Sequence, residues 1–287
     1  MRVAATGLLV FACAALTMGC LSHSRRPTVP AIVRSFAPPI QPDGVILDYV
    51  LVEQALSDAF IDRDLWENAL PVGQPETRAL LAENGLRAGI LLGTAPQKLQ
   101  TLLDSDIDTV SPRRLTFQHR KAAVIPTAAP RDPCRYRVLT DISARPNMVE
   151  LNDARCGIVV RPELSSNGGV KIWCEPLVQH GALQEWYRPN EDGTQFIKEE
   201  DAPTEKYPVL GFEATLGAED YLLIGCSSDE PLSLGAVTFT SEKSGNPRQR
   251  ILVIRAHQAR PNSGPDLPPI HDPFKLPSPA SQAAGKK

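Results

Sequence analysis

The pattern of hydrophobic and polar positions changes character near residue 111. Before this point, runs of β-branched and apolar residues alternate with stretches in which apolar residues recur at helical spacing. The order strand, helix, helix, strand, helix predicts a small α/β module over 43–111, with its two strands adjacent and covered on one face. The expected elements are a strand at 45–53, one or two short helices within 56–70, a helix from Pro75 to a stop at Asn84 and Gly85, a strand at 86–92, and a helix capped by Thr94.

From about 112 to 258 the helical periodicity disappears, and short alternating runs recur between turn signals. The clearest turn is 165–169, where Asn167 and Gly168 supply the positive φ angles of a tight hairpin. This spacing predicts an antiparallel β-domain, either a sandwich or a curved sheet, and therefore an α+β fold for the chain. The expected strands are 115–119, 122–126, 135–141, 148–151, 156–164, 170–178, 185–189, 194–198, 209–216, 221–226, 235–241 and 250–257.

Proline-rich segments flank the predicted domains. Residues 20–42 have the composition of a flexible tether. Residues 259–287 contain seven prolines and too few apolar residues to offset chain entropy, so we expect a disordered tail. Docking of this tail into an aromatic groove as a polyproline II segment is the alternative.

The first twenty residues indicate where the protein acts. Arg2 precedes an apolar run over 3–16, which is typical of an export signal. Residues 17–20 (TMGC) resemble the lipobox of bacterial lipoprotein signals. This resemblance implies that 1–19 is a signal peptide and that Cys20 is acylated, for example by palmitate. Ser22, where aspartate would favour the inner membrane, implies an outer-membrane lipoprotein that faces the periplasm or the exterior.

Two other interpretations of this segment remain open. Residues 12–14 (ACA) fit an ordinary signal-peptidase site, with cleavage near Ala14 and a soluble exported product. Residues 3–19 could instead remain as an uncleaved anchor. All three interpretations place the folded part outside the cytoplasm, in the cell envelope or beyond it.

Charge and composition limit the predicted partners. The 287 residues include 30 Lys and Arg against 33 Asp and Glu, and the arginines are scattered in short groups. This distribution predicts no nucleic-acid surface. The predicted partners are the membrane, through lipidated Cys20, and envelope proteins or further copies of the same chain.

Four cysteines remain after the signal segment: Cys134, Cys156, Cys174 and Cys226. An oxidising envelope permits disulfides, and we expect one among the four, with a pairing that the sequence leaves unknown. Buried free thiols are the alternative, because three of these residues lie in apolar runs. Their spacing lacks a C-x-x-C pair or a histidine at zinc spacing, so no metal site is predicted.

The search for catalytic chemistry finds no recognisable motif. His119, His180 and His257 are the histidines of the predicted domains, and none belongs to a known metal or nucleophile signature. No glycine-rich run matches a nucleotide-binding fingerprint, so no cofactor is predicted. A deep cleft that places a carboxylate at hydrogen-bond distance from one of these histidines would instead favour an enzyme.

Two further groups of residues suggest ligand binding. Carboxylates at 104, 106 and 108 have the spacing of a calcium loop, but Thr109 and Leu115 replace its glycine and its bidentate glutamate. We therefore interpret them as an acidic, solvated helix end. Trp173 and Trp186, with Tyr187, could form a sugar-binding platform, although core and hairpin packing is the more common role.

Residues 169–178 (GVKIWCEPLV) and 212–225 (FEATLGAEDYLLIG) resemble parts of the secretin β-domain of bacterial secretion channels. Pro176 matches a proline that ends the first strand, Asp220 lies near the turn, and Gly225 fits the first glycine of a pair whose second position is Cys226. The resemblance implies a related β scaffold.

Together these features predict an exported, lipid-anchored envelope protein that acts as a non-catalytic binding or scaffold module. A secretin-like component of a secretion system is one alternative. An envelope enzyme with an unmarked active site is the other.

Overall fold

The computed structural model describes residues 44–259, except 57, 118–120, 191 and 244. The predicted signal peptide, Cys20, the tether, the proline-rich tail and His119 all lie outside the described residues. Within the described part of the chain, no helix is long and apolar enough to cross a membrane.

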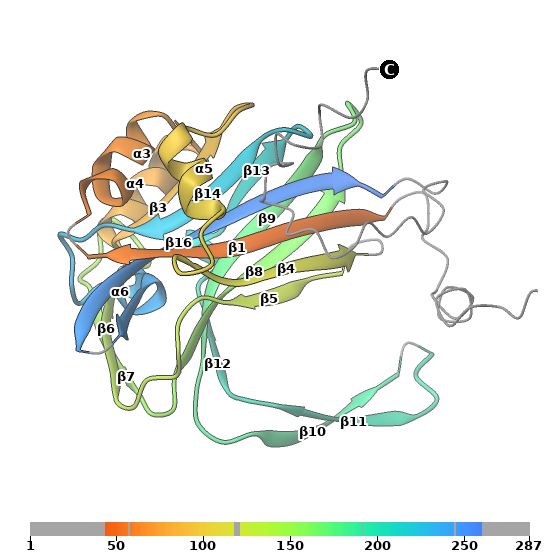
Figure 1. The fold of residues 1–287 in the computed structure, drawn as a ribbon. Coiled ribbons are helices and arrows are strands. Elements are labelled where there is room, and N and C mark those ends of the chain that lie inside the picture. The colour runs from red at the N-terminus through yellow and green to blue at the C-terminus, as the bar shows by residue number, and fades with distance from the viewer. Residues whose placement is uncertain (1–43, 57, 118–120, 191, 244, 260–287) are drawn as a thin grey trace, which may run out of the picture. The chain divides into compact units, whose positions relative to one another are not determined.

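The larger of two main sheets joins strands from both ends of the described chain (Figure 1). The pairing of β1 (Val45–Ala55) with β16 (Asn246–Gln258) runs antiparallel over the whole length of β1. The strand order is β2-β3-β14-β16-β1-β4, and β15 pairs with β16 at one end. The other strands of this sheet are β2 (Leu70–Pro71), β3 (Leu86–Leu91), β4 (Thr109–Phe117), β14 (Tyr221–Cys226) and β15 (Thr240–Lys243).

The second sheet has the order β12-β9-β8-β5, with β13 also paired to β9. Inward-facing residues of both main sheets contribute to one hydrophobic cluster, as in a sandwich. The antiparallel β-rich part of the predicted fold is thus confirmed. The strands of the second sheet are β5 (Ala123–Pro126), β8 (Arg155–Leu164), β9 (Val170–Gln179), β12 (Thr204–Lys206) and β13 (Phe212–Leu216). Two separate hairpins are formed by β6 (Cys134–Val138) with β7 (Asn147–Leu151) and by β10 (Gln184–Pro189) with β11 (Phe196–Asp201).

Short helices cover the second face of the large sheet. Residues from η1, α3 and α5 pack there with Val50, Val52, Leu223 and Val253 in a second hydrophobic cluster. The large sheet is therefore buried on both faces, which explains the apolar runs 49–52 in β1 and 251–254 in β16. The helices are η1 (Phe60–Asp64, a π-helix), α3 (Leu65–Glu67), α4 (Pro75–Glu83), α5 (Gln97–Leu103), η2 (Pro208–Leu210, a 3₁₀ helix) and α6 (Leu234–Phe239).

The structure does not support a separate N-terminal α/β module. The strands β1 and β3 belong to one sheet, but β16 and β14 lie between them, so they are not neighbours. These intervening strands come from the C-terminal half of the chain. Long-range pairing of this kind leaves no local pattern in the sequence, so local periodicity suggested a self-contained unit.

The expected strand at 235–241 is also wrong, because residues Leu234–Phe239 form α6. The Ser233 hydroxyl caps this helix by accepting a hydrogen bond from the Ala236 amide at 3.1 Å. A Cβ atom on Gly235 would lie only 2.1 Å from the carbonyl oxygen of Gly85. Gly235 therefore permits a close contact between α6 and the end of α4, and this tertiary contact favours the helix over the strand.

Other local predictions are confirmed or adjusted. α4 begins at Pro75, and Gly85 follows it with a φ of +66°. In the 165–169 turn only Gly168 has positive φ, while the Asn167 side chain accepts a hydrogen bond from the Gly169 amide at 3.2 Å. α5 is preceded by Pro96 rather than capped by Thr94.

Pro176 does not end its strand, because β9 continues to Gln179. It lies where the partner on one edge of β9 changes from β13 to β12. Proline has no amide N–H, so this gap in the ladder is a position where it loses no hydrogen bond.

Candidate functional site

The four cysteines singled out in the sequence are buried free thiols. The thiols of Cys134 and Cys156 interact directly, which lowers the pKa of Cys134 and raises the pKa of Cys156, because a thiolate at Cys134 accepts a hydrogen bond from Cys156. Burial alone raises the pKa of Cys174, and burial raises that of Cys226 to about 12. The disulfide expected among the four cysteines remains a prediction. The contact between the thiols of Cys134 and Cys156 makes these two the expected pair.

The described histidines lie apart from each other. Nε2 of His180 is 3.7 Å from Oε1 of Glu205, which is longer than a hydrogen bond. His257 lines a hollow of about 520 Å³ in which Arg255 pairs with Glu219 at 3.2 Å. These positions do not place a histidine in the polar cleft described below.

The acidic run after α5 is arranged locally. Oδ2 of Asp108 accepts a hydrogen bond from the Ser105 hydroxyl at 2.7 Å. Among the residues that the structure describes, no group of three or more His, Cys, Asp or Glu side chains is placed to hold a metal ion.

The aromatic residues considered for a sugar platform lie in different sheets. Trp173 is on β9 and packs against Gly211, where an added Cβ would be 2.3 Å from its ring. Trp186 and Tyr187 are consecutive on β10, so their side chains point to opposite faces of that strand. The structure therefore does not unite the three in one surface.

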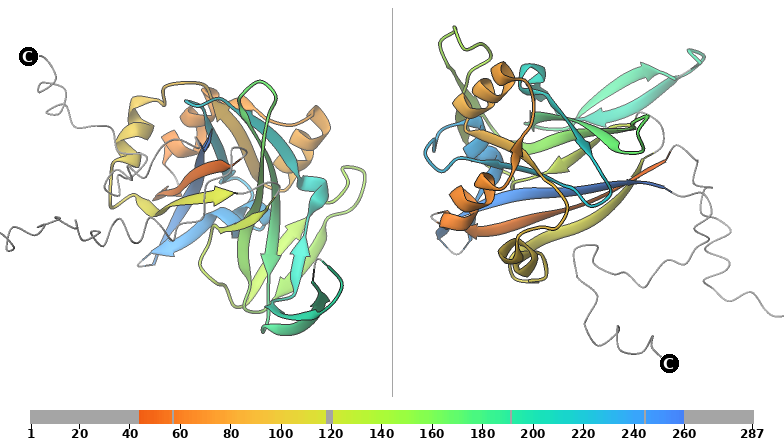
Figure 2. Two further views of the ribbon diagram at one scale, coloured as in Figure 1. Left: turned by 90° about the vertical axis from the view of Figure 1, so that its right-hand side faces the viewer. Right: turned by 90° about the horizontal axis from the view of Figure 1, so that it is seen from above.

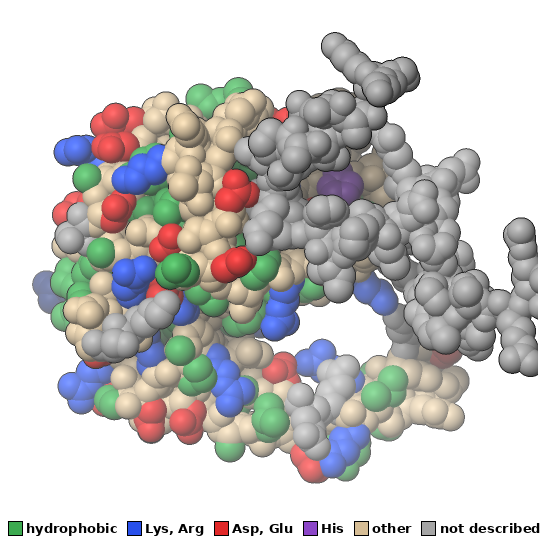
Figure 3. Space-filling model, viewed as in Figure 1, with side chains coloured by type: hydrophobic (Ala, Val, Ile, Leu, Met, Phe, Trp, Pro, Cys, Tyr) green, Lys and Arg blue, Asp and Glu red, His purple; other side chains and the backbone are tan. Residues whose placement is uncertain are grey.

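The β10–β11 hairpin, which we call the arm, extends away from the two main sheets (Figures 1 and 2). β10 and β11 pair only with each other among the described strands. Four large apolar residues of the arm are exposed: Trp186 (50%), Tyr187 (65%), Phe196 (73%) and Ile197 (51%). The strand register places Trp186 and Ile197 on one face and Tyr187 and Phe196 on the other. Figure 3 shows hydrophobic side chains on the arm interspersed with charged ones.

A buried ion-pair network lies where β1 meets β16. Glu53 is 3% exposed, and its carboxylate accepts hydrogen bonds from Nε of Arg250 at 2.7 Å and from the Ser241 hydroxyl at 3.0 Å. Nε of Arg248 is 3.7 Å from the other carboxylate oxygen. Burial acts to raise the pKa of Glu53, but the hydrogen bonds from Arg250 and Ser241 and the two guanidinium charges outweigh it and lower this pKa.

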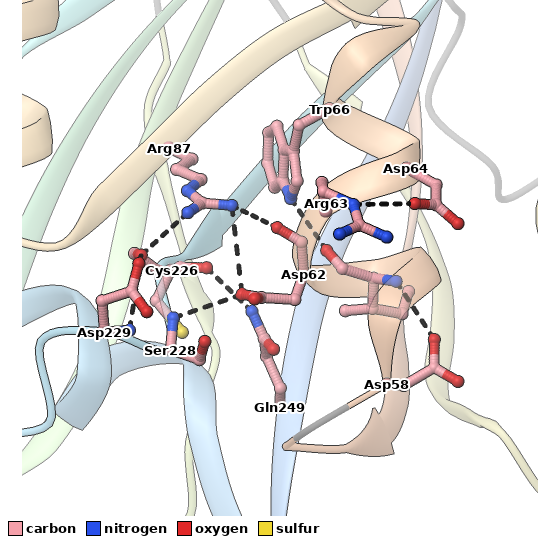
Figure 4. A network of polar contacts seen from close by, with 12 residues as sticks. Asp58, Asp62, Arg63, Asp64, Trp66, Arg87, Cys226, Ser228, Asp229 and Gln249 are labelled. Carbon is pink, nitrogen blue, oxygen red and sulfur yellow. Dashed lines mark hydrogen bonds and ion pairs between the residues drawn. The ribbon is translucent and has the colours of Figure 1, made fainter.

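A second polar network fixes the loop that follows β14 (Figure 4). The Arg87 guanidinium donates to the Ser227 hydroxyl at 2.8 Å and to the backbone carbonyl of Asp62. The Asp62 carboxylate in turn accepts a hydrogen bond from the Ser228 amide at 3.3 Å. Because η1 and β3 supply these partners, the conformation of the loop is set by residues distant in the sequence.

The two networks border a cleft of about 690 Å³, which we call the arginine cleft. A hollow of about 600 Å³, lined in part by Arg248, shares Leu56, Ser228 and Pro247 with it. The volume of the arginine cleft is in the range of ligand-binding pockets. The polar side chains that line the arginine cleft include Arg131, Ser227, Ser228, Thr240, Ser241 and Arg250.

Sequence reasoning did not find the arginine cleft, because its residues come from three distant regions, residue 56, 129–131 and 227–250. One signal was present: Glu53 ends an apolar run, and Arg248 and Arg250 come just before the apolar run 251–254. Charged residues in otherwise apolar strands are rarely buried unless they are paired.

No protein-family model matches the chain, and no curated protein matches it. Solved structures of secretin domains have a weak resemblance to it. The secretin-domain β-barrel of InvG from the Salmonella SPI-1 injectisome has 11% identity and a TM-score of 0.26, over 78% of this chain and 65% of that chain. GspD from enteropathogenic Escherichia coli has 11% identity and a TM-score of 0.22, over 80% and 73%.

The pilotin–secretin complex AspS–GspD from ETEC has 12% identity and a TM-score of 0.21, over 88% of this chain and 59% of that chain. The chain thus spans less than two thirds of the InvG structure and of this complex chain. At these TM-scores the resemblance is too weak to support an argument about function.

Proposed function

We propose that this chain is an exported, lipid-anchored cell-envelope protein that acts as a non-catalytic scaffold and assembles with further copies of itself through the arm. The export signal and Cys20 support the location. The observation that carries the scaffold role is the arm, which exposes aromatic residues on both of its faces.

An isolated two-stranded hairpin is at best marginally stable in water, because it has too little surface on which to bury its apolar residues. The four exposed side chains of the arm offer roughly 400–500 Å² of apolar surface, given the 150–250 Å² that an aromatic side chain can bury. This surface is divided between the two faces of the arm, so apolar residues are exposed on both of them. A bound partner would therefore cover surface that the rest of the chain leaves exposed.

A second copy of the chain fits this surface. Both outer edges of the arm lack a strand partner among the described residues, so two arms can extend one sheet by edge pairing. The arm carries both signs of charge, as the 2.5 Å ion pair between Lys198 and Glu185 illustrates. Residues 184–201 include six acidic and two basic residues, so two arms repel each other at low salt, and the apolar contact between them must outweigh this repulsion.

The oligomeric state tests this proposal. We expect the mature, acylated chain, extracted in a gentle detergent, to have the mass of a multimer by light scattering after size exclusion. Trp186→Ser combined with Phe196→Ser removes one aromatic residue from each face of the arm and should yield monomers. A ring of many copies would support the secretin-like form of the proposal, and a dimer would support a simpler scaffold. A monomeric wild type would overturn both.

The matched control is Ile107→Ser, which removes an exposed apolar side chain elsewhere on the chain. This variant should assemble as the wild type does. If it dissociates as readily as the arm variant, general surface hydrophobicity rather than the arm drives assembly.

Membrane attachment is tested separately. Each buried methylene of an acyl chain contributes about 0.8 kcal/mol, so two or three chains anchor a protein almost permanently. Cys20→Ala should therefore release the protein from the membrane fraction. Retention of this variant in the membrane would exclude the lipidated-Cys20 interpretation, whatever the state of assembly.

A further inference from the structure

We propose that the arginine cleft binds an acidic peptide segment in an extended conformation, through its carboxylate groups. This binding site is distinct from the arm, and it does not depend on self-assembly. The argument rests on the unused hydrogen-bond donors of two fixed arginines, on the charge around them and on an open strand edge beside them.

Arg131 and Arg250 are held in place and still have donors to spare. Nη2 of Arg131 donates to the backbone carbonyl of Thr240 at 2.5 Å and to the Thr240 hydroxyl at 2.9 Å. Arg250 donates to Glu53 through Nε and to the carbonyl of Thr127 through Nη1 at 2.9 Å. A guanidinium has five N–H groups, so each arginine keeps about three donors that no described protein group accepts.

The charge around the cleft favours an anion. Two guanidinium groups, those of Arg131 and Arg250, line the cleft together with the exposed Glu242, and Arg250 also pairs with the buried carboxylate of Glu53. Glu53 is already paired with Arg250 and Arg248, whereas no described carboxylate pairs with Arg131. Because carboxylates accept two parallel hydrogen bonds from a guanidinium, a ligand with more than one carboxylate can use both forks.

The shape and lining favour a peptide over a free inorganic anion. Apolar residues, among them Leu56, Ala236 and Pro247, line the cleft between the polar groups. β15 contributes Thr240 and Ser241 to the lining and pairs only with β16 among the described strands, so its other edge is open. An extended segment can place backbone groups along this edge and acidic side chains toward the arginines.

Titration calorimetry on the full mature chain tests the proposal, with an acetylated Asp-Glu-Asp-Glu tetrapeptide amide as the probe. We expect saturable binding that weakens as salt is raised, because screening reduces the attraction. The Asn-Gln-Asn-Gln peptide, which has the same shape without the charges, should not bind. Absence of saturable binding of the acidic peptide up to about 1 mM would overturn the proposal.

Arg131→Gln is the informative variant, because Arg131 is not part of the Glu53 network. It should weaken binding of the acidic peptide at least about ten-fold, as expected for the loss of a bidentate charged contact. Arg135→Gln is the matched control, since Arg135 lies nearby in the chain but pairs with Glu150 outside the cleft. Equal weakening by both variants would overturn the assignment.

Two further measurements keep these results interpretable. Thermal unfolding of Arg131→Gln should match that of the wild type to within a few degrees, and Arg131→Lys, which retains the charge but not the fork, should restore part of the affinity. Inorganic phosphate is the competing ligand. If phosphate binds as tightly as the peptide, the cleft is a general anion site and the peptide assignment is wrong.

Discussion

Replacement of Glu53 by alanine should strongly destabilise the fold. Glu53 accepts two hydrogen bonds and forms ion pairs with Arg250 and Arg248, and the side chains of these arginines are only 14% and 23% exposed. Removal of the carboxylate leaves two guanidinium charges in a largely buried environment without their partner. Breaking a buried ion pair in this way costs about 3–5 kcal/mol of unfolding free energy.

This cost converts into a measurable thermal shift. In a domain of 150–250 residues, 1 kcal/mol corresponds to about 2–4 °C, so the melting temperature of Glu53→Ala should fall by roughly 6–20 °C. Urea unfolding followed by circular dichroism gives the free energy directly, and the midpoint should decrease without a change in slope.

Glu230→Ala is the matched control. Glu230 pairs with Arg137 at 2.7 Å, the same distance as between Glu53 and Arg250, but both side chains are substantially exposed, at 45% and 38%. Exposed pairs contribute about 0–1 kcal/mol, because water screens them. Similar losses in Glu53→Ala and Glu230→Ala would refute the reasoning, since burial would then make no difference to the value of the pair.

The pH dependence follows from the same network. The folded-state pKa of Glu53 is lowered from its ordinary value of 4.5, so its contribution to stability is present above pH 4.5 and is lost as the pH falls through the lowered value. The difference in unfolding free energy between wild type and Glu53→Ala should therefore shrink below pH 4.5. A difference that stays constant through this range would contradict the assignment.

Two further predictions concern packing and thiol chemistry. Gly235→Ala should lower the unfolding free energy by about 1–3 kcal/mol or more, because its Cβ would lie 2.1 Å from the backbone oxygen of Gly85. Gly217→Ala is the control, and it should be milder because its Cβ meets only the end of a side chain, at 3.0 Å. Equal urea midpoints for the two variants would contradict the effect of the close contact. In an oxidising envelope, exchange with an oxidised dithiol protein should join Cys134 to Cys156 in a disulfide, with loss of two hydrogens. Peptide mass mapping without reduction would detect this bond. A disulfide with any other pairing would contradict the direct contact between the two thiols.

Secondary-structure elements could be predicted from the sequence where short-range residue patterns determine them. The runs that became β1, β8, β9 and β14 follow from apolar and β-branched residues, and the end of α4 follows from Asn84 and Gly85. Both strands of the arm were also expected, at 185–189 and 194–198. Trp186 and Tyr187 were considered for a sugar platform, but the exposure of Phe196 and Ile197 was not predicted, because an apolar residue in a strand is normally assigned to the core.

Features that depend on distant contacts could not be predicted in this way. α6 is a helix although its sequence suits a strand, because Ser233 caps it and Gly235 packs against the end of α4. The arginine cleft unites Arg131, the loop after β14 and Arg250, which are held by Thr240, Asp62 and Glu53 respectively.

The sequence by itself determined a β-rich antiparallel fold, the places of its main turns, and the prediction of an exported chain with a lipid at Cys20, because residue composition and short-range periodicity encode each of these. Only the tertiary structure decided that the first and last strands share one sheet, that Glu53 is buried between two arginines, and that the arm extends alone. These depend on which segments meet across about two hundred residues, and such pairings are selected by the free energy of the whole core, which no local pattern records.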